Sequence, residues 1–452
     1  MQQFSSIYAD YAADMGYEHL KPKVIEQVKK LILDFAGVSL AGYKLMQFPR
    51  SIVSYISSLG GTPEATIFQA KKKFPAVNAA FANAACAHAI DMDDGHRFAA
   101  LHPGTVVIPA ALAAAELVGG STTELIAGIV AGYEVMIRIG MAINPSCLNR
   151  GFHSTGLAGP FGAAVAAGNI MRLSREEIVS SLGLCGLQAS GLMQTDHEAE
   201  GAKVKPINPA RAAMSGLLSC ILTQRGAKGP LYIFEGEDGF LRAVADEVKS
   251  DLLTRDLGRK FEICNVYIKF YAACRHAHAP MDAALKAFSN SQIDTSKITK
   301  VLVETYIVAI KQAGTAYATT ASAGRFSIPF SVALVLIKKK AGAAEYSEEN
   351  IRDQNIQILA AKVQLLVGNK WEQVYPEKRG ATVTIFDSND RVWSAEVELA
   401  KGEPENPASL KDIYEKFHDN AKLQLSERDV ERLEDGIMNL ENLLLDDFIS
   451  LI

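Results

Sequence analysis

The stretch from about residue 21 to residue 260 repeats apolar side chains at helical spacing and is rich in Ala and Gly. In Val24–Ala41, for example, Val24, Val28, Leu31 and Phe35 recur three or four residues apart, which predicts an amphipathic helix. The same pattern predicts helices at Asn78–Ile90, Ala110–Val118, Thr122–Ile139, Gly159–Met171 and Ala210–Thr223. Because small side chains let helix backbones approach closely, we expect these helices to form a dense bundle.

The pattern changes after about residue 262. Lys300–Ala309 alternates like a strand, and Ala381–Asp387 and Val392–Leu399 flank a Ser-Asn-Asp turn that is typical of a hairpin. Helical patterns at Pro280–Ser289 and Ser327–Lys338 lie between these strands. Together they predict a smaller α+β unit.

The chain beyond residue 401 is expected to rejoin the helical part. Residues 401–408 contain two prolines and have the character of a linker. Leu410–Ile452 is helical in pattern, with Leu433 and Ile437 on one apolar stripe. We therefore predict a mainly α fold, in which an all-helical domain of residues 1–262 and 405–452 carries a smaller α+β domain of residues 263–404.

Charge and composition exclude several classes of function. A net charge of −5 argues against nucleic acid as a partner, because phosphate binding needs a concentrated basic surface. The first residues resemble no signal or transit peptide, and no uninterrupted apolar stretch is long enough for a membrane span. The six cysteines form no C-x-x-C pair, so we expect free thiols in a cytoplasmic protein without a zinc site or an iron–sulfur cluster.

The densest group of ionisable residues lies between His88 and His102. Three histidines and the carboxylates of Asp91, Asp93 and Asp94 fall within fifteen residues, where an Ala-rich helix gives way to a loop containing Gly and Pro. A calcium loop counted from Asp91 fails, because its twelfth position holds His102 instead of Glu. A metal site formed by His88, Asp91 and His102, or a helix-capping role for Asp93 or Asp94, remains an alternative. The pattern favours a His–Asp pair for general acid–base catalysis.

Three further segments supply candidate binding groups. Gly151 and Gly156 bracket His153 just ahead of a helix. Lys205 precedes Asn208-Pro209, a predicted helix N-cap and first helical residue, so its charge adds to the positive end of the helix dipole.

The third segment surrounds the predicted domain boundary and contains Lys269, Cys274, Arg275 and His278. Arg275 could bind a carboxylate in bidentate fashion, and Cys274 is the thiol to test for reactivity, although packing is its simpler role. These cations, histidines and an Asp together suggest a site for a small polycarboxylate, because preplaced cations stabilise the charge that builds when a proton beside a carboxylate is removed.

The combination of these motifs resembles the MmgE/PrpD family, which comprises 2-methylcitrate dehydratases, cis-aconitate decarboxylases and an iminodisuccinate epimerase. The resemblance covers the chain from about residue 5 to its end. It rests on segments that occur in the expected order: Asn83 to Asp94, His102-Pro-Gly, Gly132 to Gly140, Gly151-Phe-His153, Lys205-Pro206, Cys274-Arg275-x-x-His278 and Phe326-Ser-Ile.

The resemblance implies a homodimer whose subunits have an all-helical domain and an α+β lid, with the active site between the two and no metal or organic cofactor. By position, the catalytic residues would be Asp91, His102, His153, Lys205 and Lys269. The substrate-binding residues would be His88, Cys274, Arg275 and His278. Within this set we expect His102 to transfer a proton, Asp91 to orient it and His153 to act from the opposite side.

At three positions this chain departs from the decarboxylases of the family that it resembles. Those enzymes tend to have Thr, His and Tyr where this chain has Gly95, Cys274 and Phe330. These departures count against cis-aconitate decarboxylation. The sequence therefore favours a hydro-lyase acting on a small hydroxy-polycarboxylate such as a 2-methylcitrate-like acid. An epimerase of a small dicarboxylate is the main alternative, and a decarboxylase or a binding protein without activity is less favoured.

Overall fold

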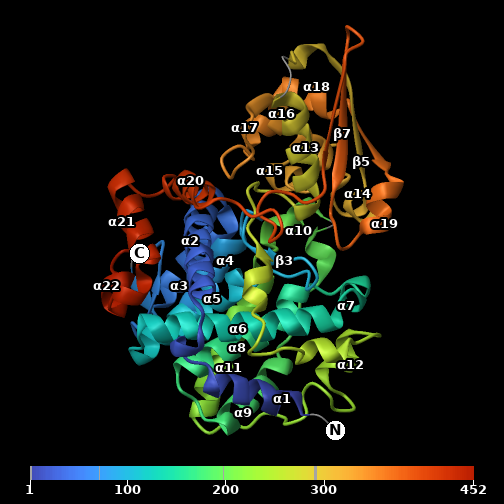
Figure 1. Ribbon diagram of the computed structural model, residues 1–452. Helices are drawn as coiled ribbons and strands as arrows, with labels where there is room; N and C mark the ends of the chain where they lie inside the picture. Colours follow the sequence, from blue (N-terminus) through green and yellow to red (C-terminus); the bar gives the residue numbers. More distant parts are fainter. Residues whose placement is uncertain (1–2, 71, 197, 290–292) are drawn as a thin grey trace.

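The computed structural model describes residues 3–452 except residues 71, 197 and 290–292, and it confirms a mainly α fold (Figure 1). The helices before residue 245 form the lower part of the molecule in this view. They are α1 (Phe4–Asp14), α2 (Pro22–Leu45), α3 (Gln47–Leu59), α4 (Ala76–His88), α5 (Gly104–Val118), α6 (Thr122–Ile143), α7 (Ser146–Asn149), α8 (Ser154–Ile170), α9 (Arg175–Gly186), α10 (Ala199–Val204), α11 (Ile207–Gln224) and α12 (Phe240–Val244). A short hairpin of β1 (Ala65–Ile67) and β2 (Lys72–Phe74) precedes α4.

Small residues bring the central helices of this part together, as the sequence predicts. Helix α6 packs along α8, and α8 packs along α11. A Cβ atom on Gly132 of α6 would lie 2.6 Å from the carbonyl oxygen of Gly162, and one on Gly162 would lie 2.6 Å from Cβ of Met136. Since real Cβ atoms do not approach so closely, glycine at these positions sets the spacing between α6 and α8.

Helix α6 is long and apolar enough to cross a membrane by length and composition alone, with a mean hydropathy of 1.6. However, 94% of its most apolar window is buried inside the protein. Its apolar surface is therefore used in the core of the helical bundle.

The C-terminal part contains a four-stranded mixed sheet in the order β6-β5-β7-β8, the largest among the described residues. Its strands are β5 (Ile298–Thr305), β6 (Val363–Val367), β7 (Ala381–Asp387) and β8 (Val392–Val397). Only β5 and β6 run parallel. Helix α13 (His278–Ser289) packs on β7 and β8 and also contacts α16 (Ile328–Lys338). The smaller helices here are α14 (Ile307–Ala313), α15 (Ala321–Gly324), α17 (Glu348–Arg352), α18 (Gln354–Ala360) and α19 (Asn369–Val374).

The last helices, α20 (Leu410–Ala421), α21 (Glu427–Met438) and α22 (Leu445–Ile449), return to the helical part. Helices α20 and α21 pack against α2, as the red and blue ribbons of Figure 1 show. Lys416 of α20 forms a buried ion pair with Asp34 of α2 and donates a hydrogen bond to the carbonyl oxygen of Met92 at 2.9 Å. The C-terminal helices thus hold the loop that follows α4.

A two-residue strand pair joins the helical part to the C-terminal part beside that loop. Gly95 and His96 of β3 (Gly95–His96) pair antiparallel with Tyr267 and Val266 of β4 (Val266–Tyr267). Gly95 is required at this position, because a Cβ atom there would lie 2.4 Å from the Tyr267 hydroxyl oxygen. This pairing places residues 91–104 against residues 266–278.

Candidate active site

A cavity of about 110 Å³ lies where these two segments meet. Seven of the residues predicted from the sequence line it: Asp91, His102, His153, Lys205, Lys269, Cys274 and Arg275. Asp91 and His102 come from the loop between α4 and α5, His153 precedes α8, and Lys205 lies between α10 and α11. Lys269, Cys274 and Arg275 enter from the segment between β4 and α13. The fold therefore brings together residues that are up to 184 positions apart, from Asp91 to Arg275.

His102 has a fixed tautomer. Its Nδ1 atom lies 2.6 Å from the backbone carbonyl oxygen of Asp94 and 3.3 Å from Oδ2 of Asp93. Because a carbonyl oxygen only accepts hydrogen bonds, Nδ1 carries the hydrogen and Nε2 keeps the lone pair of the neutral ring. Burial lowers the pKa of His102 below its usual value, and Asp93 offsets this only in part. At neutral pH His102 is therefore an uncharged base at the cavity wall.

Asp93, and not Asp91, orients His102. The same Oδ2 atom of Asp93 lies 2.8 Å from Nδ1 of His88, so one carboxylate accepts a hydrogen bond from His88 and also contacts the Nδ1 side of His102. Burial by itself raises the pKa of Asp93, but His88 and His102 lower it more, and the net pKa lies well below the usual range. The prediction that Asp91 orients His102 is wrong, because the chain turns between the two carboxylates.

His88 lies behind His102, away from the cavity lining. The two ring centroids are 5.0 Å apart in an edge-to-face arrangement. The Nε2 atom of His88 is buried and has no hydrogen-bond partner among the described residues. His88 is therefore not placed to contact the substrate, as was predicted. Instead, its ring holds the Asp93 carboxylate in position.

Asp91 forms a buried charged cluster with two lysines. Its Oδ2 atom lies 3.2 Å from Nζ of Lys269 and its Oδ1 atom 3.5 Å from Nζ of Lys205, and Lys269 also donates to the backbone carbonyl of Asp91 at 2.9 Å. Burial raises the pKa of Asp91, but Lys269 and Lys205 lower it more, so its pKa lies well below the usual range. Asp91 has a φ of 53°, which turns the chain directly after α4.

Lys205 remains charged in this cluster. Burial lowers its pKa, but Asp196 and Asp91 raise it more, and the net pKa lies above the usual value. The Oδ2 atom of Asp196 lies 3.1 Å from Nζ of Lys205. Helix α11 begins at Ile207, so the prediction of Asn208 as its N-cap is wrong, although Lys205 does lie just before the helix.

Asp94 fixes the start of α5 beside His102. Its carboxyl group accepts hydrogen bonds from the backbone N–H of Gly104 at 2.9 Å and from the Tyr133 hydroxyl at 2.8 Å. Burial, helped by Asp93 and Asp34, raises the pKa of Asp94 to about 8. Asp94 is not the N-cap residue of α5, which is Pro103, but its side chain bonds the first backbone N–H of that helix from the preceding loop.

His153 lies across from His88, with the ring centroids 6.2 Å apart. Burial and the neighbouring Lys205 ammonium lower the pKa of His153 well below its usual value, so its ring is neutral. Its Nδ1 atom is buried, and in the part of the chain that the structure describes it has no hydrogen-bond partner. A second neutral imidazole thus lines the cavity near Lys205.

Arg275 is held by protein groups. Its Nε and Nη2 atoms donate to Oε1 of Glu403 at 3.0 and 2.8 Å, and its Nη1 atom donates to Nδ1 of His278 at 3.0 Å. The Nε2 atom of His278 donates in turn to the carbonyl of Ala273 at 3.1 Å. His278 is fully buried and does not line the cavity, so the prediction that it contacts the substrate is wrong. It positions Arg275 instead.

Cys274 lines the cavity as a neutral thiol. Burial, with a further effect of Asp91, raises its pKa to about 11. Since the thiolate is the reactive form, the structure favours the packing role over the reactive one.

Sequence reasoning missed several groups at the cavity. Asp93 was visible in the His88–His102 segment but was considered only as a cap. The glycine at position 95 was noted, yet only the strand pairing shows that it admits Tyr267 to the cavity wall. No local pattern marks the other missed lining residues, which include Asp196, Gln312 and Arg379.

Among the described residues, one group of side chains could hold a metal ion by distance. His88, Asp93 and His102 offer ligand atoms within 4.8 Å of one another. In the structure the imidazole N–H groups instead donate to Asp93 and to the carbonyl of Asp94. The metal alternative considered from the sequence used Asp91, which contacts the lysines.

Comparison with known protein families shows which proteins this chain is related to. The chain matches the MmgE/PrpD N-terminal domain over residues 7–252 and the MmgE/PrpD C-terminal domain over residues 271–442. The chain belongs to the MmgE/PrpD family. Residues 253–270 lie between the two matched MmgE/PrpD domains, and the domain boundary predicted at residue 262 falls within this segment.

Curated relatives within the MmgE/PrpD family are similar over nearly the whole chain. Cis-aconitate decarboxylase of Aspergillus terreus is 26% identical over 96% of this chain and 92% of that protein. The cis-aconitate decarboxylase-like protein of Aspergillus oryzae is 24% identical over 96% of this chain and 93% of its own length. Human cis-aconitate decarboxylase is 25% identical over 94% of this chain and 89% of its own length. All three relatives are named as cis-aconitate decarboxylases or as similar to one.

Proposed function

We propose that the protein is a cofactor-independent lyase that dehydrates a small hydroxy-polycarboxylate. The observation that carries the proposal is the neutral His102 with its lone pair on Nε2, beside two buried lysines at one cavity. A general base with a pKa near or below neutrality accepts a proton under ordinary conditions. Ammonium groups that are already in place stabilise the charge that develops on a carboxylate when the adjacent carbon loses its proton.

In the proposed reaction, Nε2 of His102 removes the proton next to a substrate carboxylate. Lys205 and Lys269 hold that carboxylate, and Asp91 keeps both ammonium groups in position. The electron pair of the C–H bond forms the double bond, and the neighbouring hydroxyl leaves as water after it takes a proton. We assign that proton to His153, which has to enter the reaction protonated; burial and Lys205 keep its ring neutral in the free protein, and the charge of a bound polyanion opposes both effects.

Decarboxylation is a second candidate, because the curated relatives are named cis-aconitate decarboxylases. It would use the same cations to hold a carboxylate, but it breaks a C–C bond and releases carbon dioxide. Epimerisation would use the same base but return the proton to the opposite face of the carbon. The three reactions therefore differ in their products more than in the residues they need.

The experiment is a screen of citrate-like, tartrate-like and aspartate-derived acids in D₂O with three readouts. Ultraviolet absorbance from a new double bond with no release of carbon dioxide supports dehydration. Release of carbon dioxide supports decarboxylation, and deuterium uptake without either product supports epimerisation. Binding of an acid without any of these changes would overturn the proposal in favour of a binding protein.

Variants make this screen specific for the site. The substitution His102→Gln should abolish turnover while substrate binding remains. The matched control is His418→Gln, because His418 lies on α20, remote from the cavity, and pairs with Glu434. The control should keep the activity of the native protein.

A further inference from the structure

A second hollow of about 300 Å³ adjoins the cavity at the catalytic residues; we call this hollow the vestibule and the catalytic cavity the inner cavity. Six of its eight lining residues also line the inner cavity, so the two spaces are continuous. Ligand cavities commonly hold roughly 300–1,000 Å³. The inner cavity of about 110 Å³ therefore accommodates only the reacting head of such a ligand, and the vestibule is available for the rest.

The two spaces differ in charge. Four cations line the inner cavity: Lys205, Lys269, Arg275 and Arg379. Among the described residues that line the vestibule, Asp196 is the single charged one. The other vestibule side chains are apolar or are uncharged amides and thiols, chiefly Leu148, Met193, Phe326, Asn149 and Gln312.

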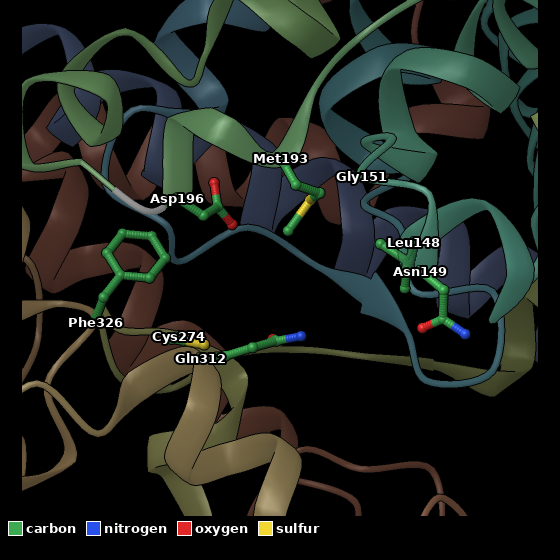
Figure 2. A pocket seen from close by; sticks show the side chains of 8 residues that line it. All are labelled: Leu148, Asn149, Gly151, Met193, Asp196, Cys274, Gln312 and Phe326. Atoms are coloured by element: carbon green, nitrogen blue, oxygen red, sulfur yellow. The ribbon is translucent and has the colours of Figure 1, made fainter.

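Asp196 stands at the boundary between the two spaces. One of its carboxylate oxygens lies 3.1 Å from Nζ of Lys205, and both residues line the inner cavity. Figure 2 shows Asp196 and Met193 on one side of the vestibule, facing Cys274 and Gln312 on the other. The two oxygens of Asp196 accept hydrogen bonds from Lys205 and from the Thr195 hydroxyl, so the group can accept a further N–H donor but offers no donor to an additional carboxylate.

We propose that the substrate carries, besides its carboxylate head, an uncharged or cationic chain that occupies the vestibule. This inference rests on the proposed function, because the head is the part that His102 and the lysines act on. Methylene groups of the chain pack against Leu148, Met193 and Phe326, and an ammonium or amide N–H on the chain donates to Asp196. A chain that ends in a carboxylate meets Asp196 and is excluded.

The test uses citrate and three citrates that carry, at one methylene carbon, an alkyl, an aminoalkyl or a carboxyalkyl chain of equal length. Calorimetry measures the Kd of each acid and absorbance measures kcat/KM. The alkyl and aminoalkyl acids should bind and react at least about tenfold better than citrate, and the carboxyalkyl acid at least about tenfold worse than the alkyl acid, each factor corresponding to roughly 1.4 kcal/mol.

Two variants identify the residues responsible. Asp196→Asn should bring the carboxyalkyl and aminoalkyl acids within a few-fold of each other, whereas Met193→Ala should remove the advantage of the alkyl chain over citrate. Asp390→Asn is the matched control, because Asp390 is an exposed residue of the β7–β8 turn. It should leave all ratios unchanged.

The outcomes separate the inference from the proposed function. If citrate and its derivatives react alike whatever chain they carry, the inference fails and the proposed function stands. If none of the four acids binds or reacts, the proposed function fails and the inference fails with it.

Discussion

The substitution Asp93→Asn tests how the structure prepares His102 as a base. The amide has the shape of the carboxylate but no charge. It replaces a charged oxygen that lies 2.8 Å from Nδ1 of His88 and 3.3 Å from Nδ1 of His102. A hydrogen bond to a charged group contributes about 1.5–3 kcal/mol. If that contribution is lost in the transition state, kcat/KM falls roughly 10- to 150-fold.

The structure also limits how large this loss can be. Replacing the aspartate of a Ser-His-Asp triad costs about 10⁴-fold, because the wrong tautomer is formed. Here the carbonyl oxygen of Asp94, 2.6 Å from Nδ1 of His102, keeps the tautomer when Asp93 is neutralised. The loss should therefore stay well below that of the triad.

The assay is the pH dependence of kcat/KM for the native protein and for Asp93→Asn. Asp93 raises the pKa of His102 against the effect of burial, so the variant's acidic limb should move to lower pH. Asp94→Asn is the matched control, because Asp94 is a neighbouring buried carboxyl whose amide can still accept from Gly104. Unchanged kcat/KM in Asp93→Asn, or an acidic limb that moves to higher pH, would refute this reasoning.

Three further predictions concern stability and packing. In the folded protein the pKa of Asp94 is raised from 3.8 to about 8, so the native state binds this proton more tightly than the unfolded state does. The free energy of unfolding should therefore fall as the pH rises from about 4 to about 8. Thermal unfolding of Asp94→Asn should not show this loss. Lys269→Met leaves the buried Asp91 with one cation fewer and should cost about 3–5 kcal/mol in urea unfolding, whereas an unchanged midpoint would contradict the pairing. Gly95→Ala should destabilise the protein by about 1–3 kcal/mol through overpacking against Tyr267, and Tyr267→Ala in the same chain should recover part of that loss.

Local patterns predicted the helices well but not the whole sheet. The helix predicted at Asn78–Ile90 is α4 (Ala76–His88), because its apolar stripe is buried as its spacing indicates. The strand predicted at Lys300–Ala309 ends at Thr305. The residues that follow include several β-branched side chains, which favoured a strand in the sequence, but they form α14. Strand β6 was missed, because it is short and pairs in parallel with β5, so no hairpin turn marks it, whereas the Ser-Asn-Asp turn marks the equally exposed edge strand β8.

The site was predictable in its residues and less so in its pairings. Residue patterns singled out Asp91, Lys205 and Lys269, and the resemblance to the family assigned them as catalytic. Their contacts with one another, across up to 178 positions, leave no local pattern. The exchange of roles between Asp91 and Asp93 depends on the left-handed backbone at Asp91, which directs the two side chains to different partners. A positive φ at a residue other than glycine is too uncommon to be assigned from sequence.

The central claim is that Nε2 of His102 removes a proton next to a substrate carboxylate. The most direct measurement is deuterium uptake at that carbon, followed by NMR in D₂O, for the native protein and for His102→Gln with the best acid from the screen. The account predicts uptake or elimination with the native protein, and no uptake with His102→Gln although the acid still binds. Undiminished exchange in His102→Gln would show that another group is the base.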